Sequence, residues 1–120
     1  MTLADAIRFG AQKRPQTTDG SVFHLIRSGE WASCALGAAW EGRGGNISEI
    51  LEVDIGTKER VYTELRQGFP VLATRVACPT DLTWETRMLR MIEWLNDHDH
   101  WTRERIAEWI DTLGLEGTHD

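Results

Sequence analysis

The run Asp97-His98-Asp99-His100 contains the side chains in this sequence that are best suited to chemistry. Imidazole and carboxylate groups bind zinc and similar metals, and alternate residues of an extended turn can point the same way. Two histidines do not complete a site, so further ligands would have to come from Cys78 or another histidine or acid. A polar turn between two helices explains the same run without a metal. We therefore keep Cys78, His98 and His100 as the candidate metal set, and we expect neither bound zinc nor any other cofactor.

The same turn is also a candidate site for binding a protein. Trp101 directly follows the turn and is not needed to complete the apolar stripe of either predicted neighbouring helix. Together with Asn96, Asp97 and Asp99, it would form an aromatic anchor inside an acidic rim, which suits a partner with a basic surface. Alternatively, Trp101 precedes a helix N-cap and packs against that helix as a hydrophobic staple. Both interpretations remain open at the level of sequence.

Enzymatic activity is not indicated by any local pattern. The sequence contains no nucleophile elbow of the form GxSxG, no Walker loop, no HExxH and no GxGxxG. Cys34 lies among alanine and leucine residues, where a thiol is usually inert. We therefore predict that the protein is not an enzyme.

The first two thirds of the chain are predicted to contain helices and one hairpin. Each boundary is marked by a polar residue that can cap a helix or by a glycine or proline that ends an element. The predicted elements are a helix over 2–14 capped by Thr2, a hairpin near 21–33, a helix over 34–41 capped by Ser33 and expected to be central and buried, a segment 47–56 that fits either a helix or a strand, and a helix over 57–67 capped by Thr57.

The last third shows the strongest helical periodicity. One helix is predicted over 84–96 with Thr83 as its N-cap, and a second over 102–113 with Thr102 as its N-cap and Gly114 at its end. The two helices are expected to pack antiparallel. The side chains predicted to join them are Met88, Met91, Leu95, Ile106, Trp109 and Ile110.

Length and composition predict a single domain. The chain has 120 residues, of which 41% are hydrophobic, and we expect a mostly helical α+β domain over 1–115 followed by a flexible tail over 116–120. It contains no apolar run of about 20 residues and no signal-peptide pattern, so we expect a cytoplasmic protein that does not enter a membrane. Cys34 and Cys78 are predicted to be buried free thiols, and most of the six tryptophans to be core residues.

The charge balance disfavours nucleic acid as a partner. The chain has 19 acidic and 13 basic residues, which gives a net charge of −6. A DNA-binding alternative would use the last two helices as a helix-turn-helix, with Arg103 and Arg105 near the start of the second. The segment 93–111 contains six acids and only these two arginines, which would repel phosphate.

Three segments resemble a group of small proteins encoded by phages and prophages of Gram-negative bacteria. They are Thr2–Gln16 (TLADAIRFGAQKRPQ), Ser33–Gly42 (SCALGAAWEG) and Ile92–Ile110 (IEWLNDHDHWTRERIAEWI). The third segment is similar to the group's pattern of Leu-Asn-Asp, His, Trp, Ser/Thr, Arg and Glu. Similar sequences often have a Cys-Pro-x-Cys element before it, whereas this chain has Cys78-Pro79-Thr80-Asp81 and lacks the second cysteine.

The resemblance implies a small cytoplasmic accessory protein from a phage or mobile element. Accessory proteins of this class often bind and block a host protein, including proteins of host defence. The leading prediction is accordingly an acidic protein that acts by protein–protein contact, possible targets being a defence protein or a nucleic-acid-binding protein. The alternatives are a DNA-binding transcriptional regulator and a small metal-binding protein. The sequence does not specify the oligomeric state.

Overall fold

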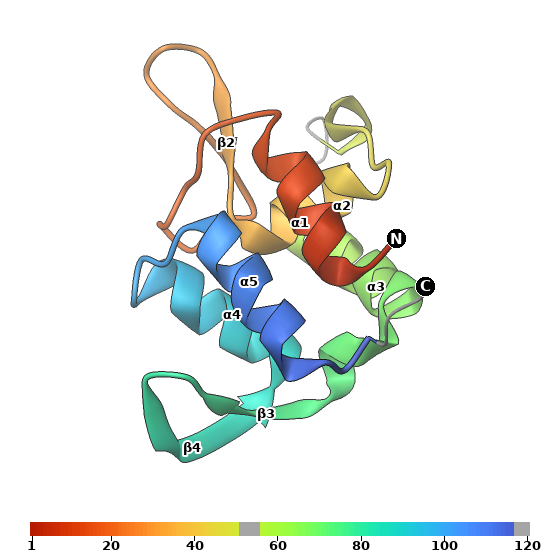
Figure 1. Cartoon of the computed structure of the whole chain (residues 1–120). Helices are drawn as coiled ribbons and strands as arrows, with labels where there is room; N and C mark the ends of the chain where they lie inside the picture. Colours follow the sequence, from red (N-terminus) through yellow and green to blue (C-terminus); the bar gives the residue numbers. More distant parts are fainter. Residues whose placement is uncertain (51–55, 117–120) are drawn as a thin grey trace.

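The structure is a computed structural model that describes residues 1–50 and 56–116 (Figure 1). Within these residues, five α-helices and two antiparallel hairpins form a mostly helical α+β domain, which confirms the predicted fold class. The elements in chain order are α1 (Leu3–Ala11), β1 (Phe23–Leu25), β2 (Trp31–Ser33), α2 (Ala35–Gly42), the 3₁₀ turn η1 (Ile47–Glu49), α3 (Thr57–Gly68), the 3₁₀ turn η2 (Pro70–Ala73), β3 (Arg75–Cys78), β4 (Asp81–Arg87), α4 (Met88–Asp97) and α5 (Arg103–Leu113).

Helices α1 and α2 cross at the centre of the domain in unusually close contact. A Cβ atom on Gly10 would lie 1.7 Å from the carbonyl oxygen of Ala38, and one on Gly42 would lie 1.8 Å from that of Ala6. Only glycine allows the two backbones to approach so closely. Every residue of α2 from 35 to 41 is buried, so the prediction of a central helix is confirmed.

The predicted caps are confirmed at two helices and shifted at two others. Thr2 accepts a hydrogen bond from the N–H of Asp5 at the start of α1, and Thr102 caps α5. Helix α2 is capped by Cys34, whose Sγ accepts from the N–H of Gly37 at 3.4 Å, and not by Ser33. Helix α3 starts at Thr57 itself after Gly56, which has a positive φ of 94°.

The first hairpin lies where the sequence places it. Phe23 pairs with Ser33 and Leu25 pairs with Trp31. The segment 47–56 begins as the 3₁₀ turn η1. The choice between helix and strand for the rest of this segment falls on residues 51–55, which lie outside the described residues.

A second hairpin replaces the first turn of a predicted helix. The prediction of a helix beginning at Trp84 with Thr83 as its N-cap is wrong, because residues 81–87 form β4 and pair with β3. Thr83 instead donates its N–H to the carboxylate of Asp81. Trp84 lies four residues before Met88, a spacing that imitates a helical stripe, although the partner strand β3 ends only three residues before β4 begins. Helix α4 begins only at Met88, whose N–H donates to the carbonyl of Thr74 at 2.8 Å.

The last two helices run in opposite directions, as Figure 1 shows. Helix α5 packs mainly against α1 and only in part against α4. It ends at Gly114, which has a left-handed conformation as predicted. Of the side chains predicted to join α4 and α5, Trp109 is partly buried and the others are fully buried: Met88, Met91, Leu95, Ile106 and Ile110.

The remaining sequence predictions concern cysteine, tryptophan and the ends of the domain. Cys34 and Cys78 are buried free thiols, as predicted. Of the six tryptophans, Trp40 and Trp101 are buried in the core and Trp84 and Trp109 are partly buried against it, so the prediction that most belong to the core holds only in part. Among the described residues, no helix combines the length and the apolar character that crossing a bilayer requires. Glu116, the first residue of the predicted tail, accepts a hydrogen bond from the N–H of Leu3 at 2.6 Å.

Candidate functional site

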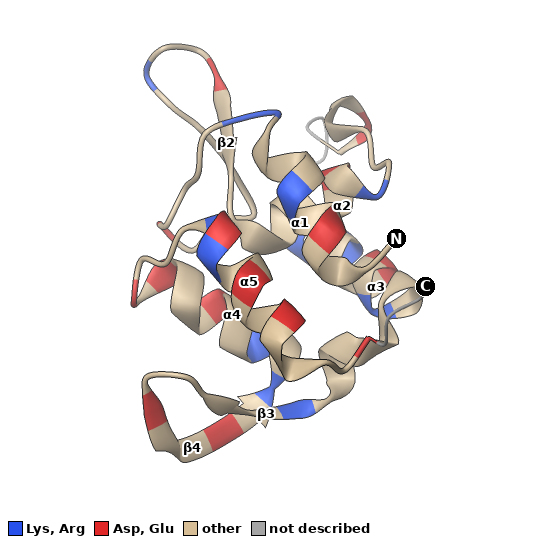
Figure 2. Cartoon of the chain, in the orientation of Figure 1, with Lys and Arg blue, Asp and Glu red and all other residues tan. Residues whose placement is uncertain are grey.

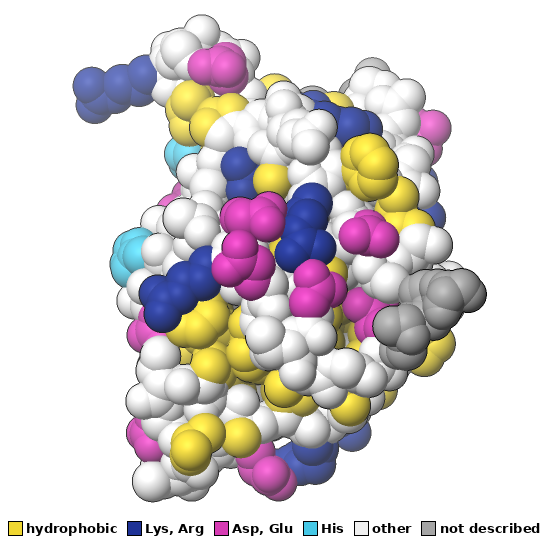
Figure 3. Space-filling view, in the orientation of Figure 1, with side chains coloured by type: hydrophobic (Ala, Val, Ile, Leu, Met, Phe, Trp, Pro, Cys, Tyr) yellow, Lys and Arg dark blue, Asp and Glu magenta, His cyan; other side chains and the backbone are white. Residues whose placement is uncertain are grey.

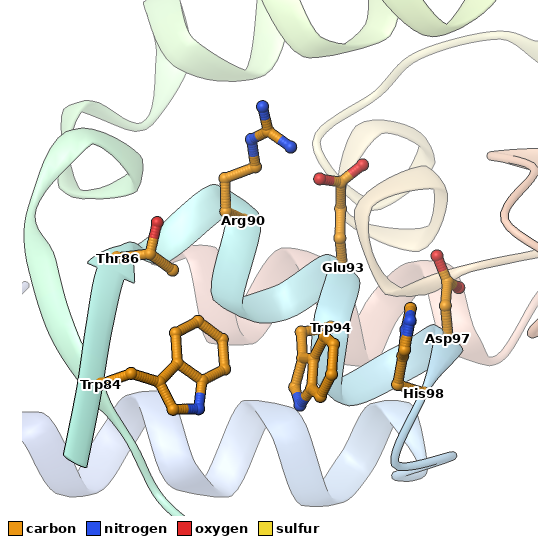
Figure 4. A pocket seen from close by; sticks show the side chains of 7 residues that line it. All are labelled: Trp84, Thr86, Arg90, Glu93, Trp94, Asp97 and His98. Carbon is orange, nitrogen blue, oxygen red and sulfur yellow. The ribbon is translucent and has the colours of Figure 1, made fainter. Parts of the chain in front are cut away.

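An open groove lies between strand β4 and the exposed side of helix α4 (Figure 4). Its volume is about 470 Å³. Because β4 continues directly into α4, one bend of the chain positions both walls. The lining residues are Trp84, Thr86, Arg90, Glu93, Trp94, Asp97 and His98.

Three rings form a continuous aromatic row along the groove. Trp84 and Trp94 meet edge to face, with ring centres 5.5 Å apart and planes at 80°. Trp94 and His98 are one helical turn apart, and their rings stack at 4.0 Å with an angle of 16°. Trp94 is nevertheless 36% exposed. The row therefore holds an accessible indole in a fixed orientation.

Charged side chains of α4 form the opposite side of the groove. Arg90, Glu93 and Asp97 follow one another at helical spacing and lie on the same side in Figure 4. Glu93 accepts a hydrogen bond from the hydroxyl of Tyr62 and forms an ion pair with Lys58 at 3.3 Å. Burial, together with the bond to Glu93, raises the pKa of Tyr62 well above its usual value. Within the described chain, Arg90 and Asp97 form no ion pair, although the carboxylate of Asp97 accepts a hydrogen bond from the side-chain amide of Asn96 at 2.8 Å.

A polar contact attaches the second hairpin to the turn between α4 and α5. The hydroxyl of Thr80 donates to the carboxylate of Asp99 at 3.2 Å, and the sulfur of Cys78 lies 3.4 Å from the same hydroxyl. His100 adopts a positive φ of 54°, which shapes the turn. This contact holds the hairpin, and with it Trp84, beside the end of α4.

The structure separates the four residues predicted to bind a partner. Asp97 is partly exposed and Asp99 is exposed, whereas Asn96 is only 1% exposed. The side chain of Asn96 accepts from the backbone N–H of Ala35 and donates to the carbonyl of Thr17. Asn96 thus holds elements of the core together.

Trp101 is also an internal residue, with 8% of its surface exposed. The backbone N–H of Trp101 donates to the carbonyl of Leu95, and its backbone carbonyl accepts from the side chain of Gln16. The guanidinium of Arg105 lies 3.8 Å from the ring centre. These contacts favour the staple interpretation over the anchor interpretation. Partner binding by residues of this turn stays a prediction.

The candidate metal ligands Cys78 and His98 lie in different environments. Cys78 is buried beside Thr80, and His98 stacks on Trp94. Among residues 1–50 and 56–116, no three side chains of His, Cys, Asp or Glu are grouped closely enough to hold a metal ion. The structure therefore does not bring Cys78, His98 and His100 together as one ligand set.

The arginines of the DNA-binding alternative are occupied within the fold. Arg103 is buried and donates to the carbonyls of Ala11 and Arg14 and to the hydroxyl of Ser33. Arg105 covers the ring of Trp101. Acidic residues recur along α5 in Figure 2, and Figure 3 shows acidic side chains gathered over the same face. This face is poorly suited to a phosphate backbone.

The groove contains residues that the sequence predictions missed. The sequence predicts Trp84 within a helix, and its patterns do not single out Arg90, Glu93 or Trp94 as binding residues. One signal was present in the sequence. Trp94 lies off the apolar stripe of Met88, Ile92 and Leu95, so a helix at this position must direct an indole outward.

Comparison with known proteins gives no relative from which a function can be transferred. No known protein family matches the chain, and no curated protein and no solved structure is significantly similar to it.

Proposed function

We propose that this protein is a non-enzymatic binding module that contacts a partner protein through the groove between β4 and α4. The observation that carries the proposal is Trp94, an indole that is partly exposed and fixed between Trp84 and His98. Exposed tryptophans held in one orientation lose little conformational freedom on binding and are frequent hot spots of interfaces.

The charge of the protein supports a partner with a basic surface. The net charge is −6, Asp97 lines the groove, and Asp99 is exposed in the turn that follows α4. Long-range attraction of this kind accelerates association with a basic protein and weakens as salt is added. Asp97 and Asp99 therefore remain in the proposed interface, whereas Asn96 and Trp101 support it from inside.

Catalysis is not part of the proposal. Burial raises the pKa of Cys34 to about 11, which keeps this thiol protonated and poorly nucleophilic at neutral pH. Cys78 is buried as well. The rings of the groove are engaged with one another, which suits a binding surface more than a set of reacting groups.

The biological setting that we propose comes from the sequence resemblance. The segments Thr2–Gln16, Ser33–Gly42 and Ile92–Ile110 resemble phage and prophage proteins. We therefore place the protein in the cytoplasm of a bacterial host as an accessory protein of a phage or mobile element. Its proposed action is to bind and block a host protein of defence or of nucleic-acid metabolism.

Capture from a bacterial host lysate tests this proposal. Tagged wild-type protein, Trp94→Ala and the control Trp31→Ala are compared, since Trp31 is a partly exposed indole on the other hairpin. We expect wild type and Trp31→Ala to retain the same stoichiometric partner, and Trp94→Ala to bind the purified partner at least about 30-fold more weakly. Equal affinity of all three proteins, or no stoichiometric partner for any of them, would contradict the proposal.

A further inference from the structure

We propose that two copies of this chain pair through the free edge of strand β1, so that their first hairpins join into one continuous antiparallel sheet. This inference concerns a surface on the other hairpin and does not depend on the groove between β4 and α4. It draws on the backbone groups of β1 that point outward, on the side chains along this edge and on two charges beside it.

Two hydrogen bonds fix which backbone groups of β1 face β2. At the base of the hairpin, the N–H of Cys34 donates to the carbonyl of Val22 at 3.0 Å. Towards the tip, the N–H of Ile26 donates to the carbonyl of Glu30 at 2.9 Å. Hydrogen-bonded and non-hydrogen-bonded pairs alternate along an antiparallel ladder, so His24 is the residue of β1 whose N–H and C=O face β2.

The other two residues of β1 direct their backbone groups outward. The N–H and C=O groups of Phe23 and Leu25 point away from β2, and within the described chain no hydrogen bond engages them. The opposite edge of the hairpin is covered at its base, because Ser33 donates to the carbonyl of Pro15 and accepts from the N–H of Thr17. The outer edge of β1 therefore offers two donors and two acceptors to another strand.

This edge is accessible and is not guarded against pairing. Leu25 is 52% exposed, His24 is exposed and Phe23 is partly exposed. Edge strands are often protected by lysine, proline or a bulge, and β1 contains none of these. Figure 1 shows the turn of this hairpin projecting beyond the helices. A two-stranded hairpin also gains stability when further strands are added.

The pattern of outward groups on β1 is complementary to itself. When two β1 strands run antiparallel with the His24 residues of both copies at the twofold axis, Phe23 of one copy lies opposite Leu25 of the other. These residues then exchange their N–H and C=O groups, and an aromatic ring packs beside an aliphatic side chain on each side of the axis. Every outward group of β1 gains a partner in this arrangement, which closes as a dimer.

Two charges beside the edge favour a second copy over an unrelated strand. In this register, the turn residue Arg27 of one copy comes next to Ser21 of the other. The carboxylate of Asp19 accepts from the N–H of Ser21 at 2.9 Å, so it lies beside that position. Arg27 is exposed and forms no ion pair among the described residues. The twofold symmetry brings Arg27 and Asp19 of opposite copies together twice.

The dimer is expected to be weak. Strand β1 has three residues, and each copy carries a net charge of −6, which opposes association. Contacts that bury less than about 1,200 Å² are typical of transient complexes. We therefore expect a dissociation constant on the order of 100 μM, so the monomer predominates in dilute solution.

Sedimentation velocity and amide hydrogen exchange test this inference on the same samples. From about 20 μM to about 1 mM protein, we expect a shift from monomer to dimer. Over the same range, exchange of the Phe23 and Leu25 N–H groups should slow, because they become hydrogen-bonded only in the dimer. The N–H of His24 is the internal control, since it faces β2 and should be protected at every concentration.

Two pairs of variants make the test specific. Leu25→Pro removes one outward N–H and none that the hairpin uses, whereas Leu25→Val retains this group. Arg27→Glu reverses the charge beside the edge, and Arg66→Glu makes the same change on the exposed side of α3. We expect Leu25→Pro to remain monomeric and Arg27→Glu to weaken the dimer at least about fivefold, with melting temperatures within a few degrees of wild type. Leu25→Val and Arg66→Glu should dimerise as wild type does.

The inference is overturned if the wild-type protein stays monomeric at millimolar concentration, or if folded Leu25→Pro dimerises as well as Leu25→Val. Equal dimerisation of Arg27→Glu and Arg66→Glu would also overturn it, and this pair decides the matter if Leu25→Pro does not fold. A monomer in which the amides of Phe23 and Leu25 slow only when a captured partner protein is added would assign the edge to that partner instead. Partner binding through Trp94 is measured separately, so either proposal can fail while the other stands.

Discussion

The side-chain carbonyl of Asn96 accepts a hydrogen bond from the backbone N–H of Ala35 at 3.0 Å, so the end of α4 satisfies the first turn of α2. The same oxygen accepts from the side chain of Gln16, and the amide nitrogen donates to the carbonyl of Thr17 at 2.9 Å. One buried side chain therefore connects α4, α2 and the segment after α1.

Loss of the Asn96 side chain should be strongly destabilising. Asn96→Ala leaves buried hydrogen-bonding groups of Ala35 and Thr17 without a partner, and we expect the free energy of unfolding to fall by about 3 kcal/mol. Urea denaturation measures this difference. Asn46→Ala is the matched control, because Asn46 is exposed and caps only a short 3₁₀ turn, and it should cost about 1 kcal/mol or less. Similar losses for the two variants would contradict the role assigned to Asn96.

The contact between α1 and α2 predicts a large difference between two identical substitutions. In Gly10→Ala the new methyl group would overlap the carbonyl of Ala38, so the helices must separate, and we expect a loss of at least about 2 kcal/mol. In Gly68→Ala the nearest atom is 4.0 Å away, on the flexible side chain of Arg43. This variant should be as stable as wild type or slightly more stable, because alanine favours the helix. The prediction fails if both variants show the same urea midpoint.

Truncation of Trp101 should lower the stability of the protein much more than truncation of Trp94. Trp101→Ala removes a buried ring together with its contact to Arg105, and we expect a loss of about 3–5 kcal/mol. Trp94→Ala removes a partly exposed ring from the aromatic row and should cost no more than about 1.5 kcal/mol. Thermal and urea unfolding of both variants measure these losses of stability. A stable Trp101→Ala protein with lost partner binding would restore the anchor interpretation.

The raised pKa of Cys34 predicts a specific loss of stability at alkaline pH. The thiol loses its proton near pH 9 in the unfolded chain but only near pH 11 in the folded chain, because burial disfavours the thiolate. The folded state therefore binds more protons between these values, and stability falls as the pH rises from 9 towards 11. The full contribution, about 3 kcal/mol, is present below pH 9.

Two measurements isolate this effect. The stability of Cys34→Ser, which keeps a capping atom, should depend less on pH between 9 and 11 than that of wild type. Alkylation of Cys34 at pH 8 should be slow in the folded protein and rapid in denaturant. Rapid alkylation of the folded protein at pH 8 would show that the thiol is neither buried nor protonated as described.

Helix ends that are marked by the chemistry of single residues were predictable from the sequence, whereas the second hairpin, whose apolar spacing imitates a helix, was not. Thr2, Thr102 and Gly114 mark helix ends by their own chemistry, so the start of α1 and both ends of α5 agree with the sequence, whereas α1 ends at Ala11 and not at residue 14. The strands β3 and β4 stabilise each other across a turn, and the spacing of Trp84 and Met88 imitates a helix. This spacing therefore predicts a helix where the structure has the second strand of a hairpin.

The candidate site was predictable only in part from the sequence. The surface position of Asp97 and Asp99 follows from a polar turn between two helices. The burial of Trp101 depends on Gln16, which is distant in sequence, and on the return of Arg105 over its ring. The groove was missed because one of its walls is the hairpin.

All lining residues of the groove lie between Trp84 and His98, on a single bend of the chain. The residues that shape the binding surface are therefore encoded by one short, continuous stretch of the gene and can be inherited together. Insertions in the first hairpin, or substitutions in the other helices, would leave the segment Trp84–His98 unchanged. Distant relatives are then best sought by the pattern of an aromatic residue ten positions before a Trp-x-x-x-His pair, rather than by similarity along the whole chain.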